Sequence, residues 1–197
     1  MNRRLSSDES GATVVEFAII LVPLLMVVLG FMELGYRSYV RSVLQGSLND
    51  IARAASVENP KLGDDNIALD VKVQNRLKQR MSKLVKSGAY KFEINSYKNF
   101  SGVGQPESLI TDVNKNGKYD AGDCWEDSNP NKSFDLDAGQ DGLGGADDVV
   151  VYEVALTAPT LLPVAGLFKT LATFDVKAKT MSRRQPYAEQ RQAQVTC

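Results

Sequence analysis

The sequence contains no histidine and only two cysteines. The absence of histidine removes the most common general base, the most common zinc ligand and the usual member of a hydrolytic triad. Basic and acidic residues nearly balance, with a formal net charge of −1 over 197 residues and a pI near 5.6. No broad basic field is therefore available for nucleic acid. We expect a protein that is not an enzyme and has no nucleic-acid partner.

The two cysteines, Cys124 and Cys197, lie far apart and match no metal-ligand spacing. In an oxidising compartment they would form one disulfide, whereas in the cytosol they would stay reduced. Two alternatives to an internal bridge remain open: Cys197 stays free, or it pairs with a cysteine of another chain.

A long apolar run lies near the N-terminus. No charged residue occurs in 17–32, and small or apolar neighbours extend the run over 12–36, where only Glu16 and Glu33 are charged. A helix rises about 1.5 Å per residue, so about 20 apolar residues cross the bilayer core of about 30 Å. The run predicts a membrane-spanning helix, with a buried core helix as the alternative. An ordinary secretory signal peptide fits poorly, because the run is long and no small-x-small cleavage site follows it.

Glu16 interrupts the start of this run. A carboxylate in apolar surroundings costs about 2.5–3.5 kcal/mol on insertion scales, so such groups usually have a function. The residues around it, GATVVEF at positions 11–17, resemble the cleavage region of a type IV prepilin. The whole stretch 11–36, including Pro23, is similar to the N-terminus of TadE-like minor pilins (pseudopilins) of the tight-adherence, or Flp, pilus system.

This resemblance implies a processing step and a topology. A prepilin peptidase would cut between Gly11 and Ala12, leaving residues 1–11 as a leader in the cytoplasm. Residues 12–36 would cross the bacterial inner membrane, and residues 37–197 would lie in the periplasm. The new amine of Ala12 and the carboxylate of Glu16 on a neighbouring subunit could then neutralise each other. The alternative for Glu16 is a headgroup position in a plain signal anchor.

The resemblance also implies the partners of the chain. These are the prepilin peptidase, a companion minor pilin, the major pilin, the inner-membrane assembly platform and membrane lipid. In this interpretation the protein takes part in assembling a tight-adherence type IV pilus, and its domain either stays in the periplasm or becomes part of the extracellular pilus. The alternative is a signal-anchored periplasmic calcium-binding or adhesive protein that does not enter a filament.

Two helices are expected in the N-terminal half. Beyond the apolar run, an amphipathic stripe predicts that the first helix continues to about residue 56, unless it breaks near Gly35. The stripe consists of Val40, Leu44, Leu48, Ile51 and Ala55. A second helix is expected over 66–87 with Gly88 as its C-cap. Its basic residues most simply form a solvated face, and contact with anionic headgroups or an acidic partner is the alternative.

Three strands are expected, over 90–97, 149–156 and 173–182. In the last strand apolar and charged residues alternate, which predicts one buried and one solvated face. The apolar segment 161–168 would lie under the sheet or contact a partner. The expected fold is therefore α+β, with a long N-terminal membrane helix running into a small pilin-like domain. That domain would hold the second helix and a roughly three-stranded antiparallel sheet.

Residues 111–148 form a segment rich in Asp, Asn and Gly that contains a repeat. The pattern that begins at Asp112 recurs 15 residues later at Asp127. The first copy resembles an EF-hand-type calcium loop, with oxygen ligands at alternating positions and Gly117 at the sharp turn. The candidate ligands of one or two calcium ions are Asp112, Asn114, Asn116, Lys118 (through its carbonyl), Asp120, Asp123, Asp127, Asn129, Asn131, Asp135 and Asp137.

The match to a calcium loop has departures. The twelfth position of the first copy is Asp123 instead of the usual glutamate. The second copy has Lys132 where glycine belongs and Ala138 at its twelfth position. Either Asp137 or Asp141 supplies a ligand, or the second copy does not bind calcium alone. The alternative to calcium binding is a solvated loop of Asx turns.

Overall fold

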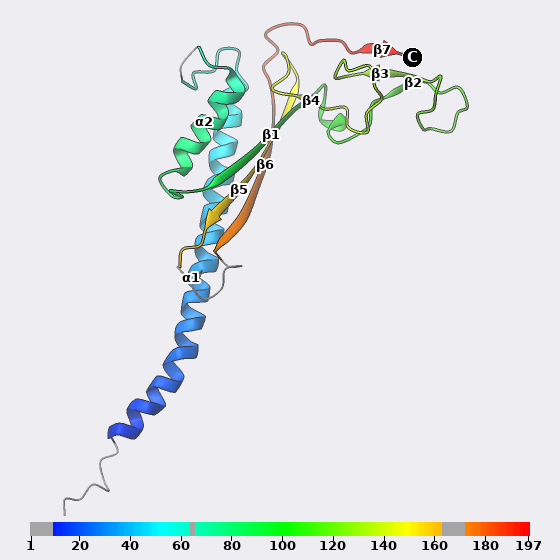
Figure 1. The fold of residues 1–197 in the computed structure, drawn as a ribbon. Helices are drawn as coiled ribbons and strands as arrows, with labels where there is room; N and C mark the ends of the chain where they lie inside the picture. Colours follow the sequence, from blue (N-terminus) through cyan, green and yellow to red (C-terminus); the bar gives the residue numbers. More distant parts are fainter. Residues whose placement is uncertain (1–9, 64–65, 163–171) are drawn as a thin grey trace, which may run out of the picture.

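The computed structural model describes residues 10–63, 66–162 and 172–197. Its longest element is helix α1 (Ser10–Ala55), which extends alone at its N-terminal end and runs along the domain at its C-terminal end (Figure 1). The expected single long helix is confirmed, and the alternative break near Gly35 is wrong. Pro23 lies inside the apolar half of α1.

The N-terminal half of α1 exposes its apolar side chains. Phe17 is 62% exposed and Phe31 is 70% exposed, and most of the residues between them are also exposed. By length and composition this helix can cross a membrane, and its most apolar stretch is not buried by the domain. A buried core helix is therefore the wrong interpretation of this half.

The C-terminal half of α1 packs on the domain through the expected stripe. All five stripe residues are buried, from Val40 to Ala55, with Leu44 completely inaccessible. They form one hydrophobic core with side chains of the second helix and the sheet. The helical spacing of apolar residues therefore predicted the buried face correctly.

Helix α2 (Leu69–Met81) is shorter than expected at both ends. It buries Val73, Leu77 and Met81 against α1 and the sheet. Gly88 does not cap this helix, because α2 ends well before it. A Cβ at Gly88 would lie only 2.7 Å from Cδ1 of Leu156, so close packing against a strand explains the glycine.

The main sheet is antiparallel, with the strand order β4-β1-β5-β6. Its strands are β1 (Ala89–Tyr97), β4 (Gln140–Asp141), β5 (Val149–Pro159) and β6 (Thr173–Arg183). In β6, Phe174, Val176 and Ala178 are buried while the charged residues between them are exposed. The alternation predicted for this strand is confirmed. Of the apolar segment 161–168, all but Leu161 and Leu162 lies outside the described residues.

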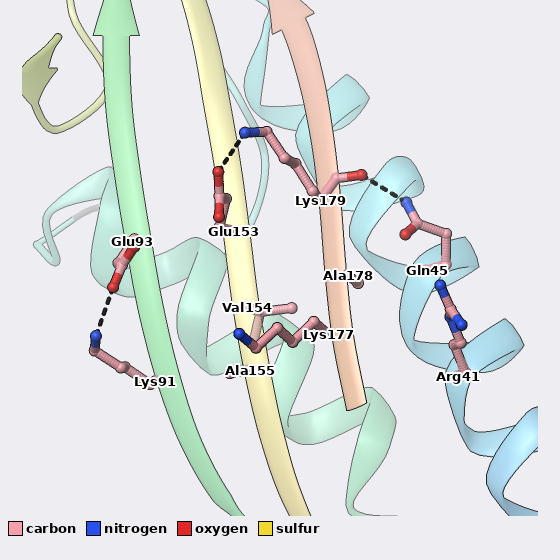
Figure 2. Close-up of a pocket in the computed structure, with 10 residues that line it drawn as sticks. All are labelled: Arg41, Gln45, Lys91, Glu93, Glu153, Val154, Ala155, Lys177, Ala178 and Lys179. Atoms are coloured by element: carbon pink, nitrogen blue, oxygen red, sulfur yellow. Dashed lines mark hydrogen bonds and ion pairs between the residues drawn. The ribbon is translucent and has the colours of Figure 1, made fainter. Parts of the chain in front are cut away.

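The face of the main sheet opposite the hydrophobic core is polar (Figure 2). Lys91 pairs with Glu93 on β1, and Lys179 on β6 pairs with Glu153 on β5. Beside β6, Nε2 of Gln45 on α1 donates to the carbonyl of Lys179 at 3.0 Å. This bond attaches α1 to the outer strand of the sheet.

A second, smaller sheet was not expected. It has the order β2-β3-β7, formed by β2 (Leu109–Thr111), β3 (Cys124–Asp127) and β7 (Gln194–Thr196). A short 3-10 helix, η1 (Phe100–Gly102), precedes it. Cys124 and Cys197 form a disulfide with an S–S distance of 2.11 Å, which joins the C-terminus to β3. The α+β class is thus confirmed, with a four-stranded sheet where about three strands were expected.

Candidate functional site

The predicted cleavage and assembly residues lie at the start of α1. Gly11 and Glu16 are exposed on its first turns, and Ala12 lies in the same helical segment. Of the predicted leader, residues 1–9 lie outside the described residues. The side chains next to Glu16 are also accessible, with Val15 59% exposed. The structure therefore leaves this carboxylate on a surface where lipid or another helix can reach it.

The acidic repeat forms two loops in the second candidate site. We call residues 112–123 the first acidic loop and residues 127–138 the second acidic loop. The first lies between β2 and β3, and the second follows β3 directly. β3 therefore lies between the two loops in the chain.

The first acidic loop is closed by bonds between its own side chains and backbone. The Asp112 carboxylate accepts from the N–H groups of Asn116 at 3.3 Å and Gly117 at 2.7 Å. The side-chain amides of Asn114 and Asn116 donate to Oδ2 of Asp120 at 2.8 and 2.7 Å. These two amides are the main reason why the pKa of Asp120 is lowered.

The second acidic loop repeats these bonds. The Asp127 carboxylate accepts from the N–H groups of Asn131 at 3.2 Å and Lys132 at 2.9 Å. The side-chain amides of Asn129 and Asn131 donate to Oδ2 of Asp135, both at the short distances of 2.7 and 2.6 Å. The repeat in the sequence is therefore also a repeat in three dimensions.

Lys132 adopts the backbone conformation of the glycine that it replaces. Its φ is 62°, close to the 74° of Gly117 in the first loop. This left-handed region favours glycine and costs other residues on the order of 1 kcal/mol. The Lys132 N–H donates to the Asp127 carboxylate, and the Ser133 N–H donates to the Asn131 side chain. These bonds hold Lys132 in the left-handed conformation despite that cost.

In the first loop, one buried carboxylate connects the two ends. Asp123 is 1% exposed, and it accepts from the N–H of Val113 at 2.9 Å and from the N–H of Asp120 at 2.8 Å. These bonds hold the beginning and the end of the turn together.

Glu107 occupies the corresponding position in the second loop. It accepts from the N–H of Ser128 at 2.7 Å and from the N–H of Asp135 at 3.1 Å. Burial is the main cause that raises the pKa of Glu107, and the two N–H donors act in the opposite direction. Asp137 is directed elsewhere, because it accepts from the Tyr97 hydroxyl and from the N–H of Gly139. Glu107 lies outside the repeat, and sequence reasoning missed it.

Three aromatic rings pack the two loops against each other. Tyr119 and Phe134, which are equivalent in the repeat, stack with ring centroids 4.4 Å apart. Trp125 of β3 meets both edge-on, at 5.1 Å from Tyr119 and 6.3 Å from Phe134. The loops are thus one packed unit built around β3.

The oxygen donors of both loops fit calcium by chemistry, since calcium prefers carboxylate, amide and carbonyl oxygens. The carboxylates are directed at N–H groups of their own loops. Within the described ranges, no three Asp, Glu, Cys or His side chains converge as they do around a bound metal. The two acidic loops are therefore folded as Asx turns, and their side chains carry the kinds of oxygen atom that calcium prefers.

Comparison with known proteins bears on the helix. Residues 11–53 match the family model described as TadE-like protein. The N-terminal segment is TadE-like. No match was found among curated proteins, and none among solved structures. A TadE-like segment on a helix that is long and apolar enough to cross a membrane is consistent with a membrane-anchored component of a pilus system.

Two short segments outside the TadE-like match contact each other. Nη1 of Arg184 donates to the carbonyl of Gly144 at 2.9 Å, and its backbone N–H donates to the carbonyl of Asp148 at 2.9 Å. Gly144 has a φ of 59°, and a Cβ there would lie 2.6 Å from Cβ of Ser96. The segments 144–150 and 184–187 are therefore joined where β5 begins and β6 ends.

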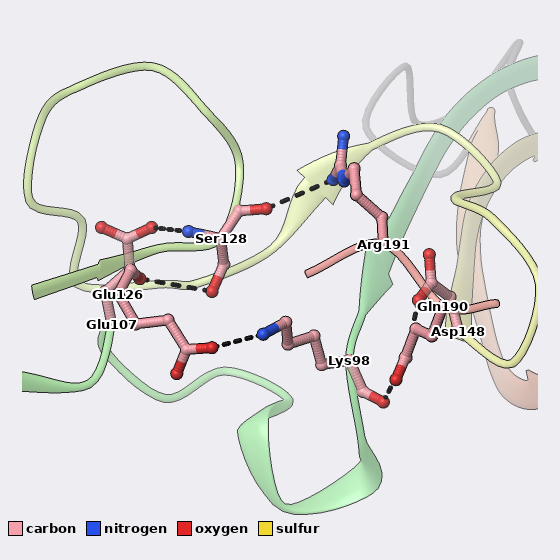
Figure 3. Close-up of polar contacts among 7 residues, drawn as sticks. All are labelled: Lys98, Glu107, Glu126, Ser128, Asp148, Gln190 and Arg191. Carbon is pink, nitrogen blue, oxygen red and sulfur yellow. Dashed lines mark hydrogen bonds and ion pairs between the residues drawn. The ribbon is translucent and has the colours of Figure 1, made fainter. Parts of the chain in front are cut away.

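The C-terminal tail links the two sheets (Figure 3). Nε2 of Gln190 donates to the carbonyl of Lys98 at 2.9 Å and to Oδ1 of Asp148 at 2.8 Å. The next residue, Arg191, donates to the carbonyl of Ser128 at 3.3 Å. The tail thus joins the second acidic loop, through Ser128, to the main sheet, through Lys98 and Asp148 next to β1 and β5.

Proposed function

We propose that this protein is a minor pilin or pseudopilin that takes part in assembling a tight-adherence type IV pilus. The observation that carries the proposal is Glu16 on the exposed apolar half of α1, within the TadE-like segment. In this proposal the chain performs no reaction. It is cleaved between Gly11 and Ala12, anchored in the inner membrane, and joined laterally to other pilins.

Charge neutralisation would drive the lateral contact. A single carboxylate in an apolar layer is costly, and an unpaired ammonium is costly for the same reason. When the new amine of Ala12 on one subunit meets Glu16 on the next, each offsets the desolvation of the other. The exposed apolar residues of both helices would then pack around this pair. The partners are the prepilin peptidase, a companion minor pilin, the major pilin and the inner-membrane assembly platform, with the domain in the periplasm.

The first test is the mass and N-terminal sequence of the protein purified from membranes. The unaltered chain should begin at Ala12. Gly11→Val should keep the leader, whereas the control Gly30→Val should be processed normally. A Cβ at either glycine meets no atom within 4 Å, so neither change disturbs the packing of the domain. A mature chain that still begins at Met1 would contradict the proposal.

The second test separates a pilin from a plain signal anchor. Glu16→Gln should be processed and inserted but should fail to crosslink with companion pilins or to support filaments. Glu58→Gln, which changes an exposed carboxylate of the domain, is the matched control. If Glu16→Gln assembles as the unaltered chain does, the alternative of an anchored periplasmic adhesive protein is favoured.

We also propose that the acidic loops bind calcium, one ion in each loop. The supporting observation is that both copies present the same donor set in the same arrangement, although only the first has an acidic twelfth residue. Glu107 would supply the missing carboxylate in the second loop. Bound calcium would neutralise the loops, whose acidic side chains otherwise repel one another.

Calorimetric titration of the metal-stripped, full-length protein with calcium chloride tests this proposal. Two calcium ions per chain are expected. Magnesium should bind more weakly, because it gives up its waters reluctantly and is rarely held by protein oxygens alone. Asp112→Asn and Asp127→Asn should each remove one site, whereas Asp175→Asn on the outer face of β6 should remove none. No calcium-dependent heat and no change in thermal unfolding at millimolar calcium would overturn it.

A further inference from the structure

The membrane-proximal end of the domain is marked by Glu33. This residue is the first charged residue after the apolar stretch of α1, and its side chain is only 14% exposed. Its Oε1 accepts from Nε of Arg37 at 2.9 Å, and its Oε2 accepts from the N–H of Leu161 at 3.0 Å. Leu161 comes shortly after β5, so this bond holds the base of the β5–β6 hairpin at the level where the apolar stretch ends.

Aromatic and basic side chains surround the same level of α1. The Tyr36 ring meets Phe174 of β6 edge-on at 5.8 Å, and the Arg37 guanidinium lies 5.1 Å from the centre of the Phe174 ring. Tyr39, one turn further, is 58% exposed. Tyrosine and arginine are typical of the headgroup layer, because the apolar part of the side chain can contact lipid while its polar end contacts water or headgroups.

The hairpin base exposes an apolar side chain at this level. Leu161 is 46% exposed, beside a helix whose own apolar surface is uncovered down to residue 14. Thr160 closes the hairpin, since its N–H donates to the carbonyl of Ala172 at 3.1 Å and its hydroxyl donates to the carbonyl of Leu162 at 3.0 Å. The backbone N–H groups of Thr160 and Leu161 are therefore both paired within the protein, as a site next to lipid requires.

We propose that Leu161 and Leu162 enter the interfacial layer of the bilayer, so that the domain contacts lipid beside α1. The occupant is lipid because this surface is continuous with the exposed membrane-crossing half of α1. Glu33 acts as a positioning residue: it pairs the Leu161 N–H, which would be costly to leave unpaired near hydrocarbon. The inference rests on the proposed membrane-spanning role of α1.

Fluorescence quenching by brominated phosphatidylcholine tests the inference on the full-length protein, with one chain in each lipid nanodisc. Trp125 is 4% exposed and provides a constant background. Leu161→Trp should lose fluorescence most strongly with bromines near the headgroup. Ile20→Trp, in the middle of the span, should lose it most strongly with bromines deep in the acyl chains. Leu136→Trp, at an 81% exposed leucine of the second acidic loop, should lose none.

The outcomes separate this inference from the proposed function. If Ile20→Trp is not quenched, the membrane-spanning role of α1 is wrong. If Ile20→Trp is quenched but Leu161→Trp and Leu162→Trp behave like Leu136→Trp, only the lipid contact of the hairpin is wrong. If the fluorescence of Leu161→Trp changes when each disc holds more than one chain, but bromine does not quench it, the hairpin base contacts another subunit. That result would also overturn the proposal. Glu33→Leu combined with Leu161→Trp should reduce the quenching, because the hairpin base is released.

Discussion

The carboxylates of Glu107 and Asp123 make equivalent pairs of hydrogen bonds, one pair in each acidic loop. Asp123 accepts from the N–H groups of Val113 and Asp120, and Glu107 accepts from their counterparts one repeat later. Asp123 belongs to its own loop, whereas Glu107 precedes both loops in the chain. The second acidic loop therefore depends on a residue outside the repeat.

Glu107→Ala should selectively loosen the second acidic loop. It leaves the N–H groups of Ser128 and Asp135 without their acceptor, which costs about 1–3 kcal/mol for each buried group that water cannot reach. Hydrogen exchange of these two amides should accelerate, while the amides of the first loop keep their protection. Glu189→Ala, at an exposed carboxylate of the tail, should change neither loop. Unchanged protection of Ser128 and Asp135 in Glu107→Ala would show that Glu107 does not close the loop.

Reduction of the disulfide between Cys124 and Cys197 should destabilise the acidic loops and the tail together. The bridge closes a segment of 73 residues, and loss of a native disulfide typically costs about 2–5 kcal/mol. Urea unfolding with and without dithiothreitol measures this difference. The double variant Cys124→Ser with Cys197→Ser should be equally unstable under both conditions. Thiol labelling of the mature, unreduced protein after unfolding would show instead that the cysteines are free.

Two leucines of α1 should respond differently to truncation. Leu44 is fully buried against the sheet, and Leu44→Ala should cost about 2–5 kcal/mol of unfolding free energy through lost burial and the cavity left behind. Leu24 is 54% exposed in the apolar half, so Leu24→Ala should leave the stability of the domain unchanged. Denaturant unfolding of both variants in the same detergent, followed by Trp125 fluorescence, measures the contrast. Equal destabilisation would mean that the domain does not fold independently of the apolar half.

Tyr152 should make the domain less stable at alkaline pH. Burial raises its pKa from 10.0 to about 12, although Arg184 acts in the opposite direction. Below pH 10 both the folded and the unfolded state keep the phenol proton. Between pH 10 and 12 the unfolded chain loses it first, so the free energy of unfolding falls by up to about 1.4 kcal/mol per pH unit.

Tyr152→Phe is the control for this pH dependence. The Tyr152 hydroxyl has no hydrogen-bond partner among the described residues, so its removal should change stability little at pH 7. Urea unfolding at pH 9 and pH 11 should show a smaller loss of stability for Tyr152→Phe than for the unaltered chain. Equal losses would assign the alkaline effect to other groups.

Much of the main domain could be predicted because each pattern depends on near neighbours in the chain. The stripe from Val40 to Ala55 and the alternation around Val176 record which face of an element is buried. The length of α2 was overestimated, since Leu84 continues the apolar spacing after the helix has ended. Gly88 was misjudged for a related reason: its small size is required by Leu156, on a strand far away in the sequence.

The candidate sites also have one part that the sequence predicted and one part that it did not. The acidic repeat predicted two similar loops, and Ala138 showed that the second lacked a carboxylate. The identity of the replacement depends on pairing between β2 and β3, where the N–H of Glu126 donates to the carbonyl of Ser108 at 2.8 Å. That bond brings Glu107 beside Ser128. No local pattern in the sequence marks such a neighbour.

The sequence alone determined the apolar helix, the position of Glu16 within it, the TadE-like character of the N-terminal segment and the doubling of the acidic loop. These features are properties of contiguous residues, and helix geometry or turn chemistry translates them directly into structure. Only the tertiary structure brought Glu107 to the second loop, joined Cys124 to Cys197 and placed Leu161 against Glu33. Each of these contacts joins residues that are distant along the chain, and they become neighbours only when strands pair and the sheet packs on α1.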